Sequence, residues 1–338
     1  MKNIAINGFG RIGRLFLRSA LQNASMNVVA INDLGDIENL AYLFTYDSVY
    51  GKYKGSVSVE GNVIIIDGKK IQFLQERDAT KLPWGQMNID VVLECTGVFE
   101  SFEKANVHIL SGAKHVILSA PAKDEDGVCD GKTILMGIND SEITAHPITS
   151  NASCTTNASA PVIQIMNESV GVEKAVLNTV HAYTATQNIV DGPTKGKDYR
   201  RGRAGAFNIS PSTTGAALAV SRVITELGGK FDGVAMRVPT ISGSAADITF
   251  ISKRPTSVEE INTILRDAAK SDRWNNTFTV TEDQLVSSDI IGMPYGAVVD
   301  LGFTKVVDGT LVKILSWYDN EAGYVSTLLK HTQKALGI

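Results

Sequence analysis

The segment from Ser150 to Ala160 holds one cysteine, Cys154, among small hydroxyl and amide residues. The apolar residues that follow, between Val162 and Val170, have helical spacing, so the N–H groups at the start of this helix are expected to lack backbone partners. Such N–H groups, with a nearby imidazolium, can lower a cysteine pKa from about 8.5 to roughly 3.5 to 7.5. We therefore interpret Cys154 as a candidate nucleophile. The alternative, a buried structural cysteine, is disfavoured by its polar neighbours.

Pro161 lies inside this predicted helix and has no backbone N–H to donate. The sequence leaves two alternatives open here: a helix that begins late, or one that is kinked after its first turn.

His181 follows the predicted strand Ala175 to Val180, and a strand end is a suitable place for a catalytic base. A histidine with a pKa near 6.5 can accept a thiol proton and later return a proton to a reacting oxygen. Taken alone, His181 is more simply explained as an ordinary hydrogen-bonded residue. Only its pairing with Cys154 favours catalysis.

The N-terminal region has the pattern of a dinucleotide-binding turn. A short apolar strand precedes Gly8, Gly10 and Gly13, which have G-x-G-x-x-G spacing and open an apolar helix. These glycines allow a tight turn and a close approach to a pyrophosphate at the helix N-terminus, where Arg11 would lie over the phosphates. A second strand ends at Asp33, which can accept the ribose hydroxyls and would repel a 2′-phosphate, so we predict NAD rather than NADP. The alternative is a glycine turn of another α/β fold.

Two later strands are expected to end at the same edge of this sheet. The first ends at Thr96 and Gly97, and the second ends at Ser119. In a doubly wound sheet the ligand binds at the carboxyl ends of the strands, so these residues are expected to face the cofactor.

The second half of the sequence contains several possible anion sites. The stretch Asp191 to Asn208 is basic and includes Lys195 and Arg201, while the segment Ser212 to Gly215 places hydroxyl groups at the start of a helix predicted to end at Leu227. Arg237 is alone in an apolar strand-like run and is costly to bury without an anion. The alternatives are a solvated basic face for the loop and an internal carboxylate partner for Arg237.

Composition limits the function classes. The 338 residues, 43% of them hydrophobic, suffice for about two domains, and the formal net charge of −4 argues against nucleic acid or an anionic membrane as a partner. The three cysteines are too few for a disulfide framework and lack zinc-ligand spacing, so we predict no metal site and a reducing compartment. No signal-peptide pattern and no long apolar run is present, and we predict a cytoplasmic protein.

The order of predicted elements gives a two-domain fold. We expect residues 1–153 to form an α/β, Rossmann-type dinucleotide-binding domain, completed by a C-terminal helix within 319–338. Residues 154–318 are expected to form an α+β catalytic domain with a mixed or antiparallel sheet.

Six motifs in order along the whole chain resemble those of the glyceraldehyde-3-phosphate dehydrogenase family. They are residues 7–14, 150–157, 181–184, 212–217, 237–240 and 316–321. The resemblance implies a glycolytic enzyme, usually a homotetramer, that converts glyceraldehyde 3-phosphate, inorganic phosphate and NAD into 1,3-bisphosphoglycerate and NADH.

The resemblance also implies roles for single residues. Cys154 corresponds to the nucleophile and His181 to the base. The substrate-phosphate contacts of the family match Thr184, Arg201 and Arg237, and the groups that hold the attacking phosphate or the substrate match Ser153, Thr155, Thr214 and Gly215. The cofactor contacts match Arg11, Ile12, Asp33, Arg77, Ser119 and Asn320. The loop from Tyr183 to Phe207 resembles the family's S-shaped loop, which lines the cofactor groove of a neighbouring subunit.

Three positions depart from the family pattern. Ala158 replaces a common second cysteine, Leu218 a common lysine, and Ala322 a common tryptophan. None of them removes a catalytic group, although Ala322 leaves a gap that another side chain must fill.

Three other functions stay open at this point. Erythrose-4-phosphate dehydrogenase is a related enzyme that releases the free acid, and the motifs at Tyr183-Thr184 and Thr214-Gly215 favour phosphorylation instead. A reductive semialdehyde dehydrogenase with NADPH conflicts with Asp33. The third alternative, an RNA-binding protein that uses the dinucleotide groove, conflicts with the negative net charge.

Overall fold

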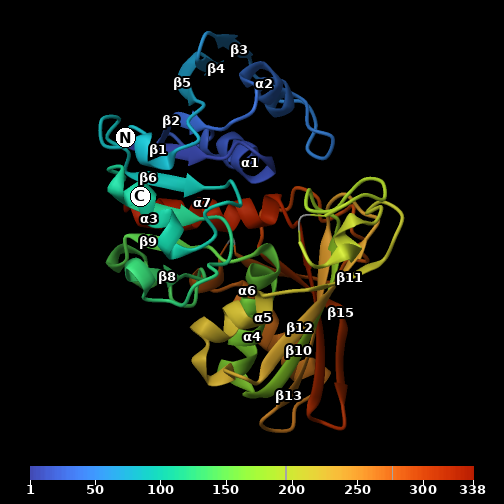
Figure 1. The fold of residues 1–338 in the computed structure, drawn as a ribbon. Helices are drawn as coiled ribbons and strands as arrows, with labels where there is room; N and C mark the ends of the chain where they lie inside the picture. Colours follow the sequence, from blue (N-terminus) through green and yellow to red (C-terminus); the bar gives the residue numbers. More distant parts are fainter. Residues whose placement is uncertain (195, 276) are drawn as a thin grey trace. The chain divides into compact units, whose positions relative to one another are not determined.

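The computed structural model describes residues 1–194, 196–275 and 277–338, so the predicted loop residue Lys195 lies outside the described residues. The chain divides into two compact units, each with its own sheet (Figure 1). The first unit comprises Met1–Ile134, Asn139–Ala152 and Leu328–Ile338, and the second comprises Leu135–Ile138 and Ser153–Thr327.

The sheet of the first unit has, among the described residues, nine strands in the order β3-β4-β5-β2-β1-β6-β7-β9-β8. From β5 to β8 every neighbouring pair is parallel, whereas β3, β4 and β5 pair antiparallel. All residues of β6 and β7 are buried, as expected for strands covered on both faces. This sheet confirms the predicted Rossmann-type fold. The strands are β1 (Lys2–Asn7), β2 (Met26–Asn32), β3 (Val57–Glu60), β4 (Val63–Ile66), β5 (Lys69–Leu74), β6 (Val91–Glu94), β7 (His115–Leu118), β8 (Gly131–Thr133) and β9 (Ile148–Ser150).

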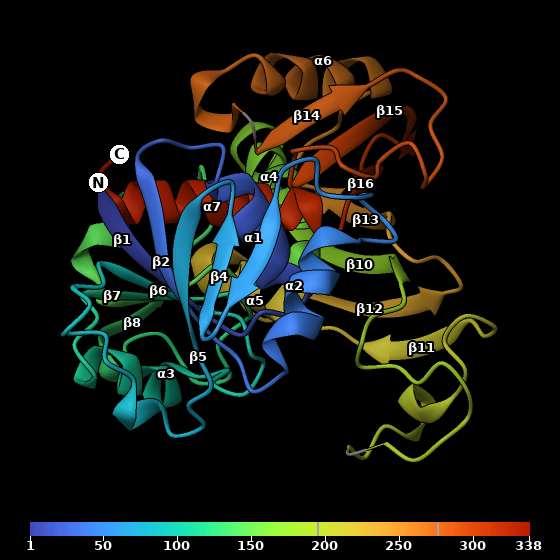
Figure 2. The same ribbon diagram turned by 90° about the horizontal axis from the view of Figure 1, so that it is seen from above.

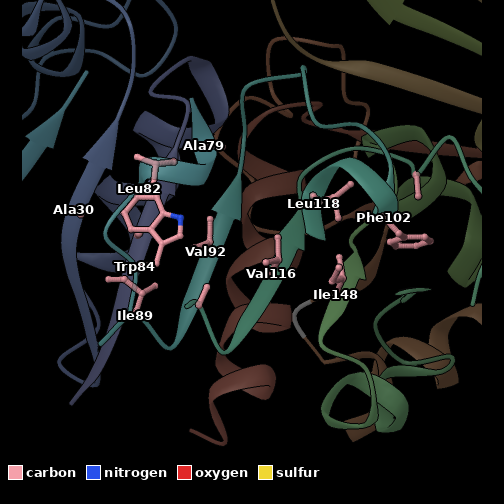
Figure 3. Close-up of a cluster of buried hydrophobic side chains, with 14 residues drawn as sticks. Ala30, Ala79, Leu82, Trp84, Ile89, Val92, Phe102, Val116, Leu118 and Ile148 are labelled. Carbon is pink, nitrogen blue, oxygen red and sulfur yellow. The ribbon is translucent and has the colours of Figure 1, made fainter. Parts of the chain in front are cut away.

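Three helices belong entirely to this unit: α1 (Arg11–Ala20), α2 (Ile37–Thr45) and α3 (Phe102–Leu110). Side-chain caps fix the start of two of them, because Asp36 accepts the N–H of Asn39 and Ser101 accepts the N–H of Lys104. A buried apolar cluster includes Trp84 together with the sheet residues Val92, Val116 and Ile148 (Figure 3).

The second unit contains a mixed sheet, which confirms the predicted α+β fold. Within the described residues its seven strands have the order β11-β12-β10-β13-β16-β15-β14. The pairs β10·β12 and β14·β15 are parallel and the others are antiparallel; Figure 2 shows β11, β12 and β10 as neighbours. The strands are β10 (Val172–Ala182), β11 (Ser210–Thr213), β12 (Phe231–Val238), β13 (Ser244–Ser252), β14 (Phe278–Thr281), β15 (Ala297–Val307) and β16 (Leu311–Tyr318).

The helices α4 (Cys154–Ser169), α5 (Ala216–Val223) and α6 (Val258–Ala269) cover one face of this sheet (Figure 1). The helix α5 is shorter than predicted: it ends at Val223, and a separate 3-10 turn spans Thr225–Leu227. The last helix, α7 (Ala322–Leu336), lies within the predicted range 319–338 and contributes residues to both units.

Two histidines of the first unit lie in a buried hydrogen-bond chain. The hydroxyl of Thr149 is 2.9 Å from His115 Nε2 and 2.8 Å from His331 Nε2, and His331 Nδ1 is 3.1 Å from Asn151 Oδ1. Burial, helped by the charge of His146, lowers the pKa of His115 to about 4. Burial, helped by His115, lowers the pKa of His331 to about 3. Both imidazoles are therefore neutral in the folded protein near pH 7.

These histidines are expected to make folding sensitive to acid. The unfolded chain binds their protons below about pH 6.5, whereas the folded chain does so only near pH 3 to 4. Each histidine therefore removes up to about 1.4 kcal/mol of unfolding free energy per pH unit as the pH falls from about 6.5 towards 4. Denaturant unfolding at pH 7, 6 and 5 measures this slope. The variant His115→Gln/His331→Gln should show a smaller slope, and an unchanged slope contradicts the assignment.

Candidate active site

Cys154 is the first residue of α4, and Ser153 caps this helix. The hydroxyl of Ser153 accepts the N–H of Thr156 at 3.0 Å, and the carbonyl of Ser153 accepts the N–H of Asn157 at 3.0 Å. The helix continues through Pro161 to Ser169, so the alternative of a late helix start is wrong. The physical reason is that Pro161 removes a single backbone hydrogen bond, while the Ser153 cap fixes the helix start one turn earlier.

The structure brings Cys154 and His181 together. Cys154 Sγ lies 3.4 Å from His181 Nε2, and His181 is buried within β10. In the register between β10 and β12, His181 is paired with Arg237, whose Nη1 lies 2.7 Å from His181 Nδ1. The carbonyl of Ala182 also lies 2.7 Å from this Nδ1; it can only accept, whereas the guanidinium can only donate, so the two contacts favour opposite tautomers of His181. Of these two tautomers, the one with the proton on Nδ1 leaves Nε2 free to accept the thiol proton.

The electrostatics of this pair differ from the sequence-based expectation. Part of Cys154 stays open to solvent, but burial of the thiol raises its pKa and outweighs Arg237, the Thr155 hydroxyl and the backbone N–H groups at the helix start. Burial and then the charge of Arg237 lower the pKa of His181 to about 3, against the Ala182 carbonyl. The expected low thiol pKa is therefore wrong for this structure. The positive charge nearest the sulfur belongs to Arg237 rather than to an imidazolium.

Tyr318, at the end of β16, is a member of this site that the sequence analysis missed. Its hydroxyl lies 2.8 Å from Thr155 Oγ1 and 2.7 Å from Thr179 Oγ1, and its ring packs edge-on against His181. Burial raises the pKa of Tyr318, so its phenol stays protonated. Its only signal in the sequence was its place in the motif 316–321.

Two of the predicted anion-binding arginines line a small hollow of the second unit. The hollow has a volume of only about 10 Å³, is partly open to solvent, and is lined by Gln187, Arg200, Arg201, Ser210, Pro211, Ser212 and Arg237. Arg201 donates to Thr186 Oγ1 at 3.0 Å and to Ser212 Oγ at 3.2 Å. In the described ranges no carboxylate pairs with Arg201 or Arg237, which rules out an internal carboxylate as the partner of Arg237. The hollow therefore presents to an anion two guanidinium groups that form no ion pair within the described residues.

The other predicted anion contacts lie at chain turns of the second unit. Thr184 Oγ1 is 2.9 Å from Thr186 Oγ1, which also accepts from Arg201. Thr214 Oγ1 accepts the N–H of Ala216, and Gly215 precedes the first residue of α5. Thr214 and Gly215 are not among the residues that line the hollow.

The first unit has a pocket of about 390 Å³ where β1, β2 and β6 end. Five predicted cofactor residues line it: Gly8, Gly10, Asp33, Arg77 and Thr96. The sequence analysis missed the other lining residues, which are Asn7, Asn32, Leu34, Glu76, Ala79, Cys95, Val98 and Phe99. Of the polar residues among them, Asn7 opens the motif 7–14 without having been assigned a role, and Asn32 and Glu76 belong to no motif, because they become neighbours only through the strand order.

Two glycines of the predicted turn are required by close packing. A Cβ on Gly8, where φ is +97°, would lie 2.6 Å from the backbone of Cys95, and one on Gly13 would collide with the Gly8 carbonyl oxygen. Both Asp33 oxygens take a backbone N–H, from Phe9 at 2.7 Å and from Gly35 at 2.8 Å. The turn is thus built around the acid that was predicted to bind ribose.

Several predicted cofactor residues do not line this pocket. The guanidinium of Arg11 pairs with Asp47 and lies over the ring of Tyr50, instead of facing the pocket. Asn320 belongs to the second unit, where its Oδ1 accepts the hydroxyl of Ser244 at 3.0 Å. Ile12, Gly13, Gly97 and Ser119 belong to the first unit but are not pocket-lining residues.

Two further findings concern other site types. Among the described residues there is no group of three or more His, Cys, Asp or Glu side chains suited to a metal ion. In the same part of the chain, no helix combines the length and the apolar character that a membrane crossing requires.

Comparison with known proteins matches both halves of the chain. The family model described as the NAD binding domain of glyceraldehyde 3-phosphate dehydrogenase matches residues 2–102, and the model of its C-terminal domain matches residues 153–320. The chain is 46% identical over 334 residues to the glyceraldehyde-3-phosphate dehydrogenase of Clostridium pasteurianum, covering 98% of this chain and 97% of that one. It is 43% identical over 335 residues to glyceraldehyde-3-phosphate dehydrogenase 1 of Kluyveromyces lactis, covering 98% and 99%.

The contact between His181 and Cys154 predicts a dependence of thiol reactivity on the imidazole. The variant His181→Asn should slow alkylation of Cys154 by iodoacetamide at pH 7 by about tenfold or more, because no base accepts the thiol proton. Peptide mass spectrometry separates Cys154 from the exposed Cys129. The variant His146→Asn is the matched control and should react at the unmodified rate. An unchanged rate in His181→Asn would show that this imidazole does not activate the thiol.

Proposed function

The chain belongs to the glyceraldehyde-3-phosphate dehydrogenase family, and we propose that Cys154 and His181 carry the chemistry of that family here. The activity is the NAD-dependent, phosphate-dependent oxidation of glyceraldehyde 3-phosphate in glycolysis, which yields 1,3-bisphosphoglycerate. The observation that supports the residue assignment most strongly is the 3.4 Å separation of Cys154 Sγ and His181 Nε2.

In the first step, Cys154 Sγ attacks the aldehyde carbon while His181 Nε2 accepts the thiol proton. A carbon–sulfur bond forms, and the carbonyl oxygen takes a proton from the imidazolium to give a thiohemiacetal. The neutral His181 of the resting site fits this role, because a base must be unprotonated before it acts. Bound NAD would supply the hydride acceptor; when the thiohemiacetal carbon gives up its hydride, the hydroxyl proton returns to His181 Nε2 and a thioester remains on Cys154.

In the second step, inorganic phosphate attacks the thioester carbon and the sulfur leaves as the thiolate. A thioester suits this step because it retains acyl-transfer potential that an oxygen ester would hold more firmly. The Arg237 guanidinium and the Thr155 hydroxyl favour the departing thiolate, since both lower the pKa of Cys154.

The two phosphate groups need separate cationic or N–H-rich sites. We assign the phosphate of the substrate to Thr184, Arg201 and Arg237, supported by the guanidinium groups of the last two, which line the hollow. We assign the attacking phosphate to the helix starts at Ser153, Thr155, Thr214 and Gly215, where hydroxyl and N–H groups gather.

We place NAD in the pocket of the first unit. Its glycine turn permits close approach of a pyrophosphate, and the Asp33 carboxylate keeps lone pairs for the ribose hydroxyls. We assign the contacts with NAD to seven residues: Gly8, Gly10, Gly13, Asp33, Arg77, Thr96 and Gly97. The contacts predicted for Arg11, Ile12, Ser119 and Asn320 stay predictions. We also propose that residues 1–153 with the C-terminal helix form the cofactor domain, and residues 154–318 the catalytic domain.

We further propose that the working form is a cytoplasmic homotetramer. Support comes from the face of β10 and β12 opposite the helices, where Val176, Val180 and Val234 are exposed side by side. Light scattering after size exclusion should give four times the mass of one chain, and a monomer mass would contradict the proposal.

The nearest alternative is erythrose-4-phosphate dehydrogenase, which releases a free acid. NADH production from glyceraldehyde 3-phosphate that rises at least tenfold on addition of inorganic phosphate is the expected result, because phosphate is the second nucleophile. Arsenate should replace phosphate. A rate independent of phosphate would favour the alternative, and faster turnover with NADP than with NAD would contradict the assignment of Asp33.

The nucleophile itself is tested by Cys154→Ser. This variant should lose at least about 10³-fold in kcat, because a serine hydroxyl beside a neutral histidine is a poorer nucleophile and its ester resists phosphate. NAD binding, measured by isothermal titration, should stay within threefold of the unmodified protein. A near-normal rate would exclude the proposed mechanism. The variant Cys129→Ser is the matched control and should keep full activity.

A further inference from the structure

A chain of buried hydrogen bonds runs under the pocket of the first unit. At one end the backbone N–H of Glu76 donates to Asn32 Oδ1 at 2.9 Å, and Asn32 Nδ2 lies 3.0 Å from the Glu76 carbonyl. Asn32 Nδ2 also donates to Asn7 Oδ1 at 2.7 Å, and Asn7 Nδ2 donates to Glu94 Oε2 at 2.6 Å. The three side chains Asn7, Asn32 and Glu94 are only 1%, 5% and 4% exposed.

Glu94 is the terminal acceptor of this series of hydrogen bonds. Its Oε1 takes the backbone N–H of Thr96 at 2.7 Å and the hydroxyl of the same residue, and its Oε2 also faces His108 Nε2 at 3.1 Å. The indole N–H of Trp84, in the buried cluster of Figure 3, donates to His108 Nδ1 at 3.1 Å. An indole N–H only donates, so Nδ1 is the acceptor and the proton of the neutral imidazole lies on Nε2, towards Glu94.

The donor and acceptor roles in this series of hydrogen bonds are fixed at both of its ends. The backbone N–H of Glu76 can only donate, and the carboxylate of Glu94 can only accept. Both carboxamides between them therefore have one satisfactory orientation. Reversing either of them would place an N–H group against another N–H group in a buried site, where water cannot serve as a substitute partner.

We propose that Glu94 and His108 are positioning residues of the dinucleotide site. They act through Asn7 and Asn32 on the backbone of Glu76 and Arg77, and thereby set one wall of the pocket. Asn7, Asn32, Glu76, Arg77 and Thr96 all line that pocket. The inference rests on the proposed placement of NAD there.

The variant Glu94→Gln tests this directly. The carboxamide replaces one acceptor oxygen with an NH₂ group. In one orientation this NH₂ group faces the donors of Thr96, and in the other it faces the donors of Asn7 and His108. The expected result is a KM for NAD raised at least tenfold, with kcat and the KM for glyceraldehyde 3-phosphate within twofold. Hydrogen exchange at the amide of Glu76 should become faster in the free protein. The matched control is Glu60→Gln, at an exposed residue of β3, and should change none of these values.

The histidine supplies a second test that also covers a poorly folding Glu94 variant. The variant His108→Leu removes the donor to Glu94 and should raise the KM for NAD at least fivefold. The conservative variant His108→Gln can accept from Trp84 through Oε1 and donate to Glu94 through Nε2, so it should restore the KM to within twofold. A purely structural role would lower thermal stability in the variants without changing the KM for NAD.

A third variant separates this inference from the placement of NAD. The variant Asp33→Ala should raise the KM for NAD whether or not Glu94 acts as proposed. If Asp33→Ala leaves that KM unchanged, the placement of NAD is wrong and the inference fails with it. If Asp33→Ala raises the KM for NAD while a folded Glu94→Gln or His108→Leu variant leaves it unchanged, the positioning role of Glu94 and His108 is overturned and the placement of NAD stands.

Discussion

The contact between Cys154 Sγ and His181 Nε2, at 3.4 Å, is the interaction on which the chemistry depends. Two local constraints produce it. The Ser153 cap makes Cys154 the first residue of α4, and the register of β10 with β12 places His181 beside Arg237. Desolvation keeps the thiol of Cys154 and the imidazole of His181 neutral at rest. Charge therefore separates only as the sulfur attacks, and the guanidinium of Arg237 favours the negative charge on that sulfur. A solvated pair would react with other electrophiles more readily.

Polar groups fixed by buried hydrogen bonds recur in both units. In the second unit, Tyr318 joins Thr155 and Thr179 behind the nucleophile. In the first unit, Glu94 at the end of β6 accepts from β1, from the turn that follows β6 and from α3. Such networks are costly when only partly satisfied, and they therefore hold the reacting or binding groups in one arrangement. The same requirement explains why the pocket walls come from residues far apart in the sequence, such as Asn32 and Glu76.

Much of the fold and the central pair could be predicted from the sequence, because periodicity, glycine spacing and strand ends are local signals. The helix α6, Val258–Ala269, shows such local signals, a serine cap and an amphipathic pattern. The pKa of Cys154 could not be predicted, because desolvation depends on residues brought in by other strands. Tyr318, Asn7 and Glu94 were missed for the same reason: a strand sequence does not reveal which strand will be its neighbour. Arg11 was expected over the phosphates, but Asp47, 36 residues away, binds its guanidinium.

The central claim is that a single sulfur carries the acyl group between the two substrates. Incubating the protein with NAD and glyceraldehyde 3-phosphate without inorganic phosphate, followed by acid quench and peptide mass spectrometry, measures this directly. The account predicts a 3-phosphoglyceroyl adduct on the Cys154 peptide that disappears when phosphate is added before the quench. NADH formation with no adduct, or with the adduct on Cys95 or Cys129, would contradict it.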